Sequence, residues 1–287
     1  MVLARRIVRT ITTDPPAPGF IGAGHTAVAV VPPGAFPDTD PFILLMDDRL
    51  DLDDRPAGGA HPHAGFETVT LVLEGTIRDR DEGLLQAGDA VWMTAGRGII
   101  HNEEVRTVGP TRILQLWLTL PRRDRWTAPG VQEIHRDALP VRREAGVEVR
   151  VYSGRSGDAQ ATTRNHVPVT LADLTLAAGA AFEQELPASY NGFVYVLDGA
   201  ASAGESATQL AKGQVGWLDR PSVEGPSVLR LTASPEGARL VLYAGEPQGD
   251  AIVSSGPFVA DTEADIRRLF AEYRAGGFAR MSELAPI

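Results

Sequence analysis

Short apolar or alternating segments make up most of the chain. Clusters rich in proline and glycine separate them, as at 32–34 and 246–249. Short hydrophobic runs with turn residues between them are typical of a β-sandwich or barrel, so the pattern predicts an all-β protein. The segments expected to form strands are Ala27–Val31, Phe42–Met46, Thr68–Leu73, Ala90–Met93, Ile113–Leu120, Phe193–Leu197, Val228–Leu231 and Arg239–Tyr243.

One segment near the C-terminus has helical periodicity instead. Its apolar residues fall at positions i, i+3, i+4 and i+7, which share one face of a helix. They are Ile266, Leu269, Phe270 and Tyr273. Thr262 precedes them and Asp265 follows Thr262 by three residues, a pattern typical of a capped helix start. Gly276–Gly277 would end this short C-terminal helix.

An internal repeat divides the chain into two similar halves. The segment Val72–Gly75 resembles Val196–Gly199, where position 73 matches position 197 at an offset of 124. The segment Gly88–Trp92 resembles Gly213–Trp217, where position 92 matches position 217 at an offset of 125. Two matches at nearly one offset indicate a duplicated barrel.

The junction between the two copies is expected at 126–143, a segment that contains two of the chain's prolines at 129 and 140. We therefore expect an N-terminal barrel over 1–135 and a C-terminal barrel with the terminal helix over 136–287.

Composition excludes several classes of function. The 287 residues include 27 Lys+Arg and 37 Asp+Glu, a net charge of −10, which argues against direct nucleic-acid binding and a polybasic membrane surface. Without cysteine, the chain has no disulfides, thiolate metal sites or cysteine nucleophile. No window reaches the ~20 apolar residues of a membrane span, and the N-terminus lacks the apolar run of a secretory signal. We expect a cytoplasmic protein.

Three of the six histidines have a spacing that suggests a metal site. His61 and His63 are two residues apart, as are His101 and Glu103, and residues i and i+2 of a strand point to the same face. If the two strands are neighbours, three imidazoles and one carboxylate converge. Such ligands suit iron(II), manganese, nickel, copper, cobalt or zinc, and not calcium or magnesium. The same spacing also fits a surface turn and a hydrogen-bonded core histidine.

The second copy does not repeat this group. At the offsets of 124 and 125, the matching positions are Glu185, Pro187, Pro226 and Val228. Restriction to one copy favours a local function for the histidines over a structural one. The remaining three histidines are interpreted as structural, and they are His25, His135 and His166.

Longer motifs resemble the pirin family, two-barrel members of the cupin superfamily. The resemblance covers nearly the whole chain. The segments that carry it are His61–Thr70, Leu73–Gly75, Gly88–Asp89, Trp92–Glu103, Leu114–Trp117, Tyr190–Gly199 and Gly256–Val259.

This resemblance implies a bicupin with one metal, usually iron, held in the N-terminal barrel at His61, His63, His101 and Glu103, and a metal-free C-terminal barrel. Some bacterial relatives act as quercetin 2,3-dioxygenases, whereas animal pirin is described as an iron-dependent transcriptional cofactor. One departure concerns Ala64, where relatives commonly have a basic residue. We therefore expect a less cationic mouth of the site.

Two functions follow as alternatives. In the first, the protein is a dioxygenase acting on a flavonol-like aromatic substrate and dioxygen, Glu103 is the general base, and carbon monoxide is released. Glu67 would line the pocket, orient a ligand or lie in water at a strand end. Gln115 and Trp117 would line the cavity unless Trp117 belongs to the core. In the second, the metal alters a surface that a protein partner binds, without catalysis. A weaker third alternative is a sensor or a detoxifying enzyme for another small molecule.

Overall fold

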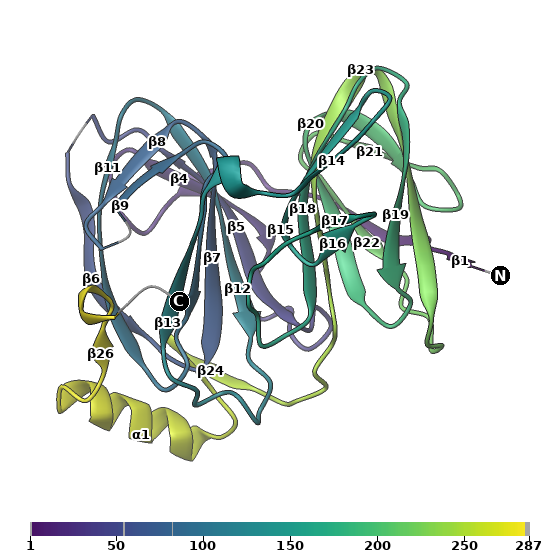
Figure 1. Ribbon diagram of the computed structural model, residues 1–287. Coiled ribbons are helices and arrows are strands. Elements are labelled where there is room, and N and C mark those ends of the chain that lie inside the picture. Colours follow the sequence, from purple (N-terminus) through teal and green to yellow (C-terminus); the bar gives the residue numbers. More distant parts are fainter. Residues whose placement is uncertain (1, 54, 82, 285–287) are drawn as a thin grey trace. The chain divides into compact units, whose positions relative to one another are not determined.

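The computed structural model of the chain describes residues 2–53, 55–81 and 83–284, without the side chain of Glu103 (Figure 1). Strands predominate throughout these residues, and one α-helix lies near the C-terminus. The predicted all-β fold class with a short C-terminal helix is confirmed.

The chain divides into two compact units, each built from two separate stretches of sequence. The first unit comprises Pro15–Asp137 and Gln248–Ile287, and the second comprises Met1–Asp14 and Ala138–Pro247. The boundary after Asp137 lies two residues from the expected one at 135. A single boundary would place each end of the chain in the unit nearest to it in sequence. Instead, Met1–Asp14 belongs to the second unit and Gln248–Ile287 to the first. The reason is strand pairing and packing, since β1 and β2 pair with strands of the second unit and the C-terminal helix packs on the first.

The first unit contains two larger sheets. Its seven-stranded sheet has the order β13 (Gly130–Ile134), β10 (Ala90–Thr94), β7 (Phe66–Glu74), β12 (Thr111–Thr119), β5 (Phe42–Leu50), β4 (His25–Val31) and β3 (Ala17–Pro18). Its five-stranded sheet has the order β26 (Ala279–Arg280), β11 (Ile99–Thr107), β8 (Thr76–Asp79) and β9 (Gly83–Gln86), with β6 (Ala57–His63) also pairing with β11. The inward side chains of both sheets form a common apolar core, in which Leu50 and Val72 of one sheet join Ile99 and Val105 of the other.

The second unit is built on one ten-stranded sheet. Its main order is β14 (Val141–Glu144), β15 (Val147–Ser153), β18 (Val169–Leu176), β23 (Pro226–Gly245), β20 (Asn191–Ala203), β22 (Gln214–Leu218) and β2 (Ile7–Thr12). Outside this order, β1 (Leu3–Ala4) and β19 (Ala181–Pro187) pair with β23, and β21 (Thr208–Ala211) pairs with β20. The long strand β23 bends the sheet around an aliphatic core, because it pairs with β18, β19 and β20 along its length.

The remaining elements are short. Two-stranded pairs are formed by β16 (Arg155–Ser156) with β17 (Ala159–Gln160), and by β24 (Val253–Ser255) with β25 (Phe258–Ala260). Two 3-10 helices occupy Arg136–Ala138 and Met281–Glu283.

The helix α1 (Glu263–Arg274) begins where the sequence predicts. The Thr262 hydroxyl accepts a hydrogen bond from the Asp265 backbone N–H at 3.1 Å, which satisfies one of the first N–H groups of the helix. Ile266 and Leu269 are buried against Ala64 and Phe258 of the first unit. The predicted capping pattern and apolar face are both confirmed.

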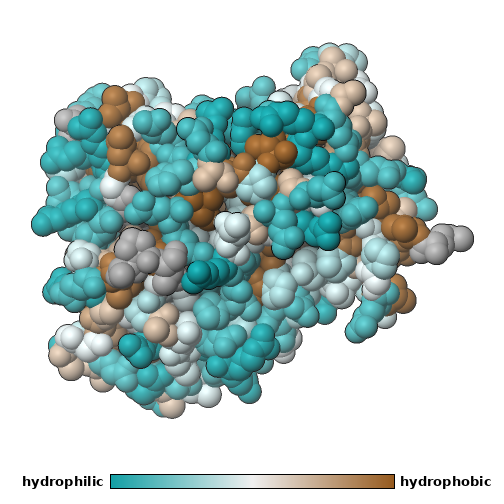
Figure 2. Space-filling view, in the orientation of Figure 1, coloured by the Kyte–Doolittle hydropathy of each residue, from teal (hydrophilic) through white to brown (hydrophobic). Residues whose placement is uncertain are grey.

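The visible surface is mainly hydrophilic, and hydrophobic residues form small groups on it (Figure 2). Within the described residues, no helix combines the length and the hydropathy that a bilayer crossing requires.

Candidate metal centre

Three histidines meet where the adjacent antiparallel strands β6 and β11 face each other. His101 pairs directly with His61, and His63 pairs with Ile99 two residues further along. Because side chains alternate along a strand, these three imidazoles project from one face. Pro62 is tolerated between the two histidines of β6 because this strand pairs with β11 alone and leaves its other edge open.

The ring nitrogens lie at distances that suit one bound ion. Nε2 of His61 is 2.9 Å from Nε2 of His101, and the potential ligand atoms of all three histidines lie within 4.8 Å of one another. Two nitrogens bonded at about 2.1 Å to one ion, at a right angle, would be about 3 Å apart. The three histidines are the one group of at least three such side chains, among those described, that could hold a metal ion.

A backbone carbonyl fixes the tautomer of His61. Its Nδ1–H donates a hydrogen bond to the carbonyl oxygen of Gly59 at 2.9 Å. Nε2 of the neutral ring is therefore the atom with the lone pair, and it is the nitrogen that faces His101. A carbonyl partner of this kind orients an imidazole for metal binding.

Burial favours the neutral form of His61 and His63. It lowers the pKa of His61, and the neighbouring His101 lowers it further. Burial also brings the pKa of His63 well below its usual value, with additional contributions from His101 and His61. Because a metal ion binds the neutral imidazole, His61 and His63 require little deprotonation before binding at neutral pH. The donor chemistry, the spacing and the protonation state all fit a divalent transition metal.

Glu103, the fourth predicted ligand, follows His101 by two residues on β11, where it pairs with Gly59. Its side chain lies outside the described residues. The structure thus brings together three of the four predicted ligands, and the role of Glu103 stays a prediction.

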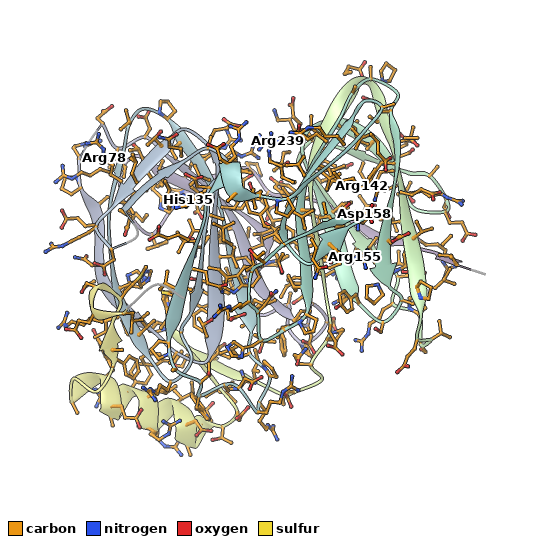
Figure 3. All side chains as sticks on the ribbon, viewed as in Figure 1. Arg78, His135, Arg142, Arg155, Asp158 and Arg239 are labelled. Carbon is orange, nitrogen blue, oxygen red and sulfur yellow. The ribbon has the colours of Figure 1, made fainter. Side chains whose placement is uncertain are left out.

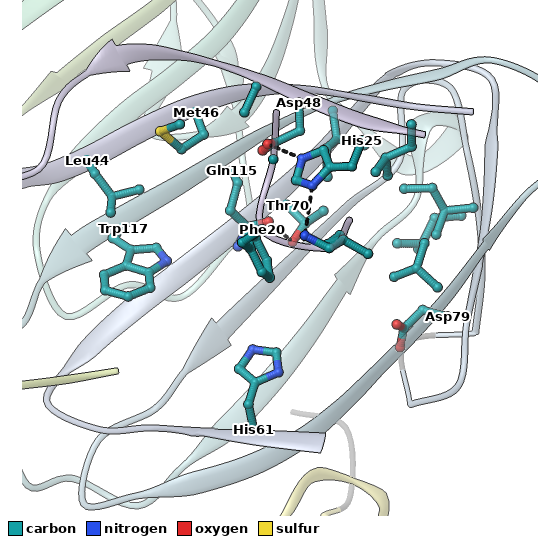
Figure 4. A pocket seen from close by; sticks show the side chains of 18 of the residues that line it. Phe20, His25, Leu44, Met46, Asp48, His61, Thr70, Asp79, Gln115 and Trp117 are labelled. Atoms are coloured by element: carbon teal, nitrogen blue, oxygen red, sulfur yellow. Dashed lines mark hydrogen bonds and ion pairs between the residues drawn. The ribbon is translucent and has the colours of Figure 1, made fainter. Parts of the chain in front are cut away.

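The imidazoles of His61 and His63 line a cavity of about 350 Å³ in the first unit, and Figure 4 shows His61 at its wall. Much of its wall is aliphatic, and polar groups are few. The polar or aromatic residues around it are Phe20, His25, Asp48, His61, His63, Thr70, Asp79, Gln115 and Trp117. A mostly apolar cavity with a small number of placed polar groups is typical of a small-molecule site.

Gln115 and Trp117 both line this cavity, as the sequence predicts. The indole of Trp117 lies 5.3 Å from the ring of His63 and 4.2 Å from that of Phe66, measured between ring centroids. Trp117 therefore packs against the core and also forms part of the cavity wall beside a metal-binding histidine.

Two of the three interpretations of Glu67 are wrong, and its role in orienting a ligand stays a prediction. This residue is fully buried and does not line the cavity, and its carboxylate accepts a hydrogen bond from the Thr94 hydroxyl at 2.7 Å. A turn at Gly65, with φ of +87°, separates β6 from β7 and interrupts the strand alternation that would place Glu67 on the face of His63. Within β7, Thr70 faces the cavity, and a residue three positions away faces the opposite side.

The expectation for Ala64, a less cationic mouth of the site, stays a prediction. This residue is fully buried against Phe258, and it does not line the cavity. Its carbonyl accepts a hydrogen bond from Val259 N–H at 2.9 Å. Ala64 therefore contributes to the packing of the C-terminal segment and not to the cavity wall.

Sequence reasoning missed one functional candidate, His25. It is buried, it lines the cavity, and its Nε2 lies 2.8 Å from Oδ1 of Asp48. The two residues are 23 positions apart and meet only because β4 pairs with β5, so no local motif reveals them. His135 lies at the surface, 3.5 Å from Glu133, and neither it nor His166 lines the cavity.

Comparison with known proteins adds the family context. Residues 34–118 match the family model "Pirin", and residues 171–279 match the model "Pirin C-terminal cupin domain". The chain is 38% identical over 246 residues to Pirin-like protein 2 of Arabidopsis thaliana, covering 83% of this chain and 75% of that protein. It is 37% identical over 277 residues to a Pseudomonas aeruginosa protein named "Putative quercetin 2,3-dioxygenase", covering 91% and 95%.

A solved structure extends this likeness to three dimensions. The quercetin 2,3-dioxygenase from Acinetobacter baumannii superposes with a TM-score of 0.83 at 27% identity, covering 96% of this chain and 98% of that one. Together with the family models, this match confirms the predicted architecture of two cupin domains.

Proposed function

The chain belongs to the pirin family, and on that premise we propose that it is a metal-dependent dioxygenase that opens the heterocyclic ring of a flavonol such as quercetin, with release of carbon monoxide. One iron(II) ion is held by His61, His63, His101 and Glu103. The names of the Pseudomonas and Acinetobacter relatives support the choice of substrate class.

The observation that carries the proposal is the position of three clustered imidazoles, two of which, those of His61 and His63, line an apolar cavity. A volume of about 350 Å³ lies within the range of small-ligand sites, near its lower end. Aliphatic side chains and the indole of Trp117 provide surfaces for a flat aromatic ring, and an ion held by the imidazoles would supply a binding partner for a chelating hydroxyl.

Each residue of the site has a distinct task in this reaction. The three imidazoles hold the ion, which when bound supplies Lewis acidity and electron exchange with dioxygen. Gly59 keeps His61 in the tautomer that presents Nε2. Glu103 accepts the proton of the flavonol hydroxyl as the substrate binds, because a carboxylate can act as the general base for such a proton. Trp117 and the aliphatic wall orient the ring and exclude water.

Oxygen uptake and carbon monoxide release by the iron-loaded protein, measured with a panel of flavonols, test the proposal. The variant Glu103→Gln is expected to lose most of the activity, by about 100-fold or more for a general base. Glu104→Gln is the matched control, since Glu104 is the next residue of β11 and forms ion pairs with Arg80 and Arg106. Its activity should equal that of the unmodified protein.

Metal content has to be measured in the same samples, because Glu103→Gln removes a ligand as well as a base. Retained iron with lost turnover supports the base, whereas lost iron supports the ligand role. Absence of turnover across the whole panel by iron-loaded protein would contradict the enzyme and favour the regulatory alternative, in which the metal site alters binding of a protein partner.

A further inference from the structure

We propose that Asp48, oriented by His25, is a specificity-determining residue of the cavity. It accepts a hydrogen bond from a ring hydroxyl of the substrate, at the end remote from the three imidazoles. The proposal rests on the proposed function, because it concerns the ligand of the same cavity. Asp48 would thereby favour polyhydroxylated aromatic substrates over those that lack the remote hydroxyl.

Strand alternation places this carboxylate among apolar side chains. Leu44, Met46 and Leu50, at alternate positions of β5 around Asp48, all line the cavity. The adjacent Asp47 belongs to the opposite face, where Nε and Nη2 of Arg112 donate to its two carboxylate oxygens at 2.9 and 2.7 Å. Asp48 has no such cation.

The hydrogen bonds of His25 determine how Asp48 is presented. The Ile21 N–H donates to Nδ1 of His25 at 3.2 Å, so the ring proton is on Nε2 and is donated to Oδ1 of Asp48 at 2.8 Å. Both ring nitrogens of His25 are engaged, which makes His25 a positioning residue. Among the described residues, Oδ2 of Asp48 has no hydrogen-bond partner. This oxygen is the acceptor available to a ligand.

A donor lies on the same sheet. The Thr70 hydroxyl donates to Oε1 of Gln115 at 2.8 Å, which leaves the amide Nε2 of Gln115 to face a ligand. A phenolic hydroxyl both donates and accepts, so it matches a carboxylate oxygen and an amide nitrogen together. His61 lies at one end of the cavity and Asp48 at the other, with Gln115 and Thr70 between them (Figure 4).

Desolvation makes this arrangement selective. A ligand without the remote hydroxyl displaces water from Asp48 and leaves a carboxylate oxygen unsatisfied in an apolar cavity, which is unfavourable. A site built to hydrogen-bond a substrate hydroxyl discriminates strongly against the analogue that lacks it. One hydrogen bond to a charged group corresponds to about a 10- to 100-fold change in affinity.

The test compares binding of quercetin with that of 3-hydroxyflavone, which keeps the chelating hydroxyl and lacks the others. Zinc-loaded protein is used because zinc prevents turnover, and affinities are measured by absorbance titration. Quercetin should bind about 10- to 100-fold more tightly to the unmodified protein.

The variant Asp48→Asn should reduce this preference to about 3-fold or less, because the His25 Nε2–H keeps the amide oxygen and turns the amide donors toward the ligand. Affinity for 3-hydroxyflavone should not fall. The control Asp51→Asn makes the same charge change at an exposed position just after β5, and it should keep the preference.

Equal affinities in the unmodified protein, or a preference that survives Asp48→Asn, would overturn the role of Asp48. If Asp48→Asn does not fold, two other measurements decide. They are the ratio of the affinities of the unmodified protein for quercetin and 3-hydroxyflavone, and a crystal structure of its zinc–quercetin complex. A ligand oxygen more than about 3.5 Å from Oδ2 then refutes the contact.

Turnover separates the two proposals. Flavonol cleavage by iron-loaded protein without a hydroxyl preference would refute the role of Asp48 and leave the dioxygenase standing. A preference without cleavage would support Asp48 and refute the dioxygenase. Absence of flavonol binding would refute both.

Discussion

The two units keep the same internal ion pair although their sites differ. In the first, Arg112 binds Asp47 through two nitrogens, and Asp47 pairs with Leu114, two residues beyond the arginine. In the second, Arg239 binds Asp173 in the same bidentate way, at 3.2 and 2.9 Å, and Asp173 again pairs with the residue two beyond the arginine. The duplicated framework therefore extends to side-chain geometry on the strands.

The difference lies in the pair of strands that carries the metal-binding group. In the first unit, β6 and β11 bear His61, His63 and His101. In the second, β19 and β23 also pair with each other, but the side chains that they bury are different. These buried residues are Phe182, Gln184, Leu186, Ser227, Leu229 and Leu231. The frame is thus shared, and a few inward positions decide which unit has a ligand set.

A second difference concerns Glu67 on β7. At the offset of 124 its counterpart is Asn191, which is buried in the second unit and accepts a hydrogen bond from Gly192 N–H at 3.0 Å. The first unit buries an ionisable carboxyl where the second buries a neutral amide. Only the first unit should therefore respond to pH at this position.

The largest expected effect is the loss of metal binding from the first unit. His63→Ala should lower the affinity for iron(II) or zinc by at least about 100-fold. Substitution of a residue that only orients a ligand already lowers metal affinity by roughly 10- to 100-fold, and this variant removes a ligand itself. His166→Ala, in the second unit, and His135→Ala, at the surface position labelled in Figure 3, should retain about one metal per chain. Elemental analysis after dialysis measures the metal content per chain, and calorimetric titration measures the affinity. Full occupancy in His63→Ala would remove the contrast between the units.

The next effect compares the two ion pairs. Arg112 is nearly buried, so Arg112→Leu leaves the Asp47 carboxylate without its main partner and should lower the free energy of unfolding by about 3–5 kcal/mol. The Arg239 side chain is 31% exposed, and its position is marked in Figure 3. Water can replace it, so Arg239→Leu should cost only about 1–2 kcal/mol.

Urea unfolding of both variants gives these values. The double variant Asp47→Leu/Arg112→Leu is the control, since removing both charges should recover much of the lost stability. Equal losses in the two single variants would show that solvent access does not distinguish the pairs.

Much of the framework is predictable from the sequence because strands and helices depend on local pattern. The strand segments, the helix after Thr262 and the shared face of His61 and His63 follow from periodicity and from the i, i+2 rule. The position of His101 beside them is implied by the family resemblance, because it depends on the pairing of two strands. The His25–Asp48 contact is not predictable, since it depends on which strands pair.

Alignment by a fixed offset also has limited accuracy. The offset of 124 assigns Glu185 and Pro187 to the positions of His61 and His63, yet both are exposed, and the buried residues of β19 are their neighbours Gln184 and Leu186. A difference of one residue in a connecting turn reverses the faces of a whole strand. The conclusion that this strand has no inward histidine is unaffected, but the individual equivalences are wrong.

The smallest effect concerns the pH response of Glu67. Burial raises its pKa to about 7, against the opposing hydrogen bond from Thr94. In the unfolded chain this carboxyl ionises near 4.5, so the folded state binds an extra proton between the two values. Its contribution to stability is present below pH 4.5 and is lost as the pH rises through about 7.

Glu67→Gln should therefore resemble the amide of Asn191. At about 1.4 kcal/mol per pKa unit, the variant should be more stable than the unmodified protein by up to about 3 kcal/mol at pH 8 and nearly equal to it at pH 4. Chemical unfolding across this pH range measures the difference. The exposed Glu205→Gln is the control and should show no pH-dependent change. If Glu67→Gln is destabilising and its cost grows with pH, the buried carboxylate is stabilised by a partner, and the contrast with Asn191 fails.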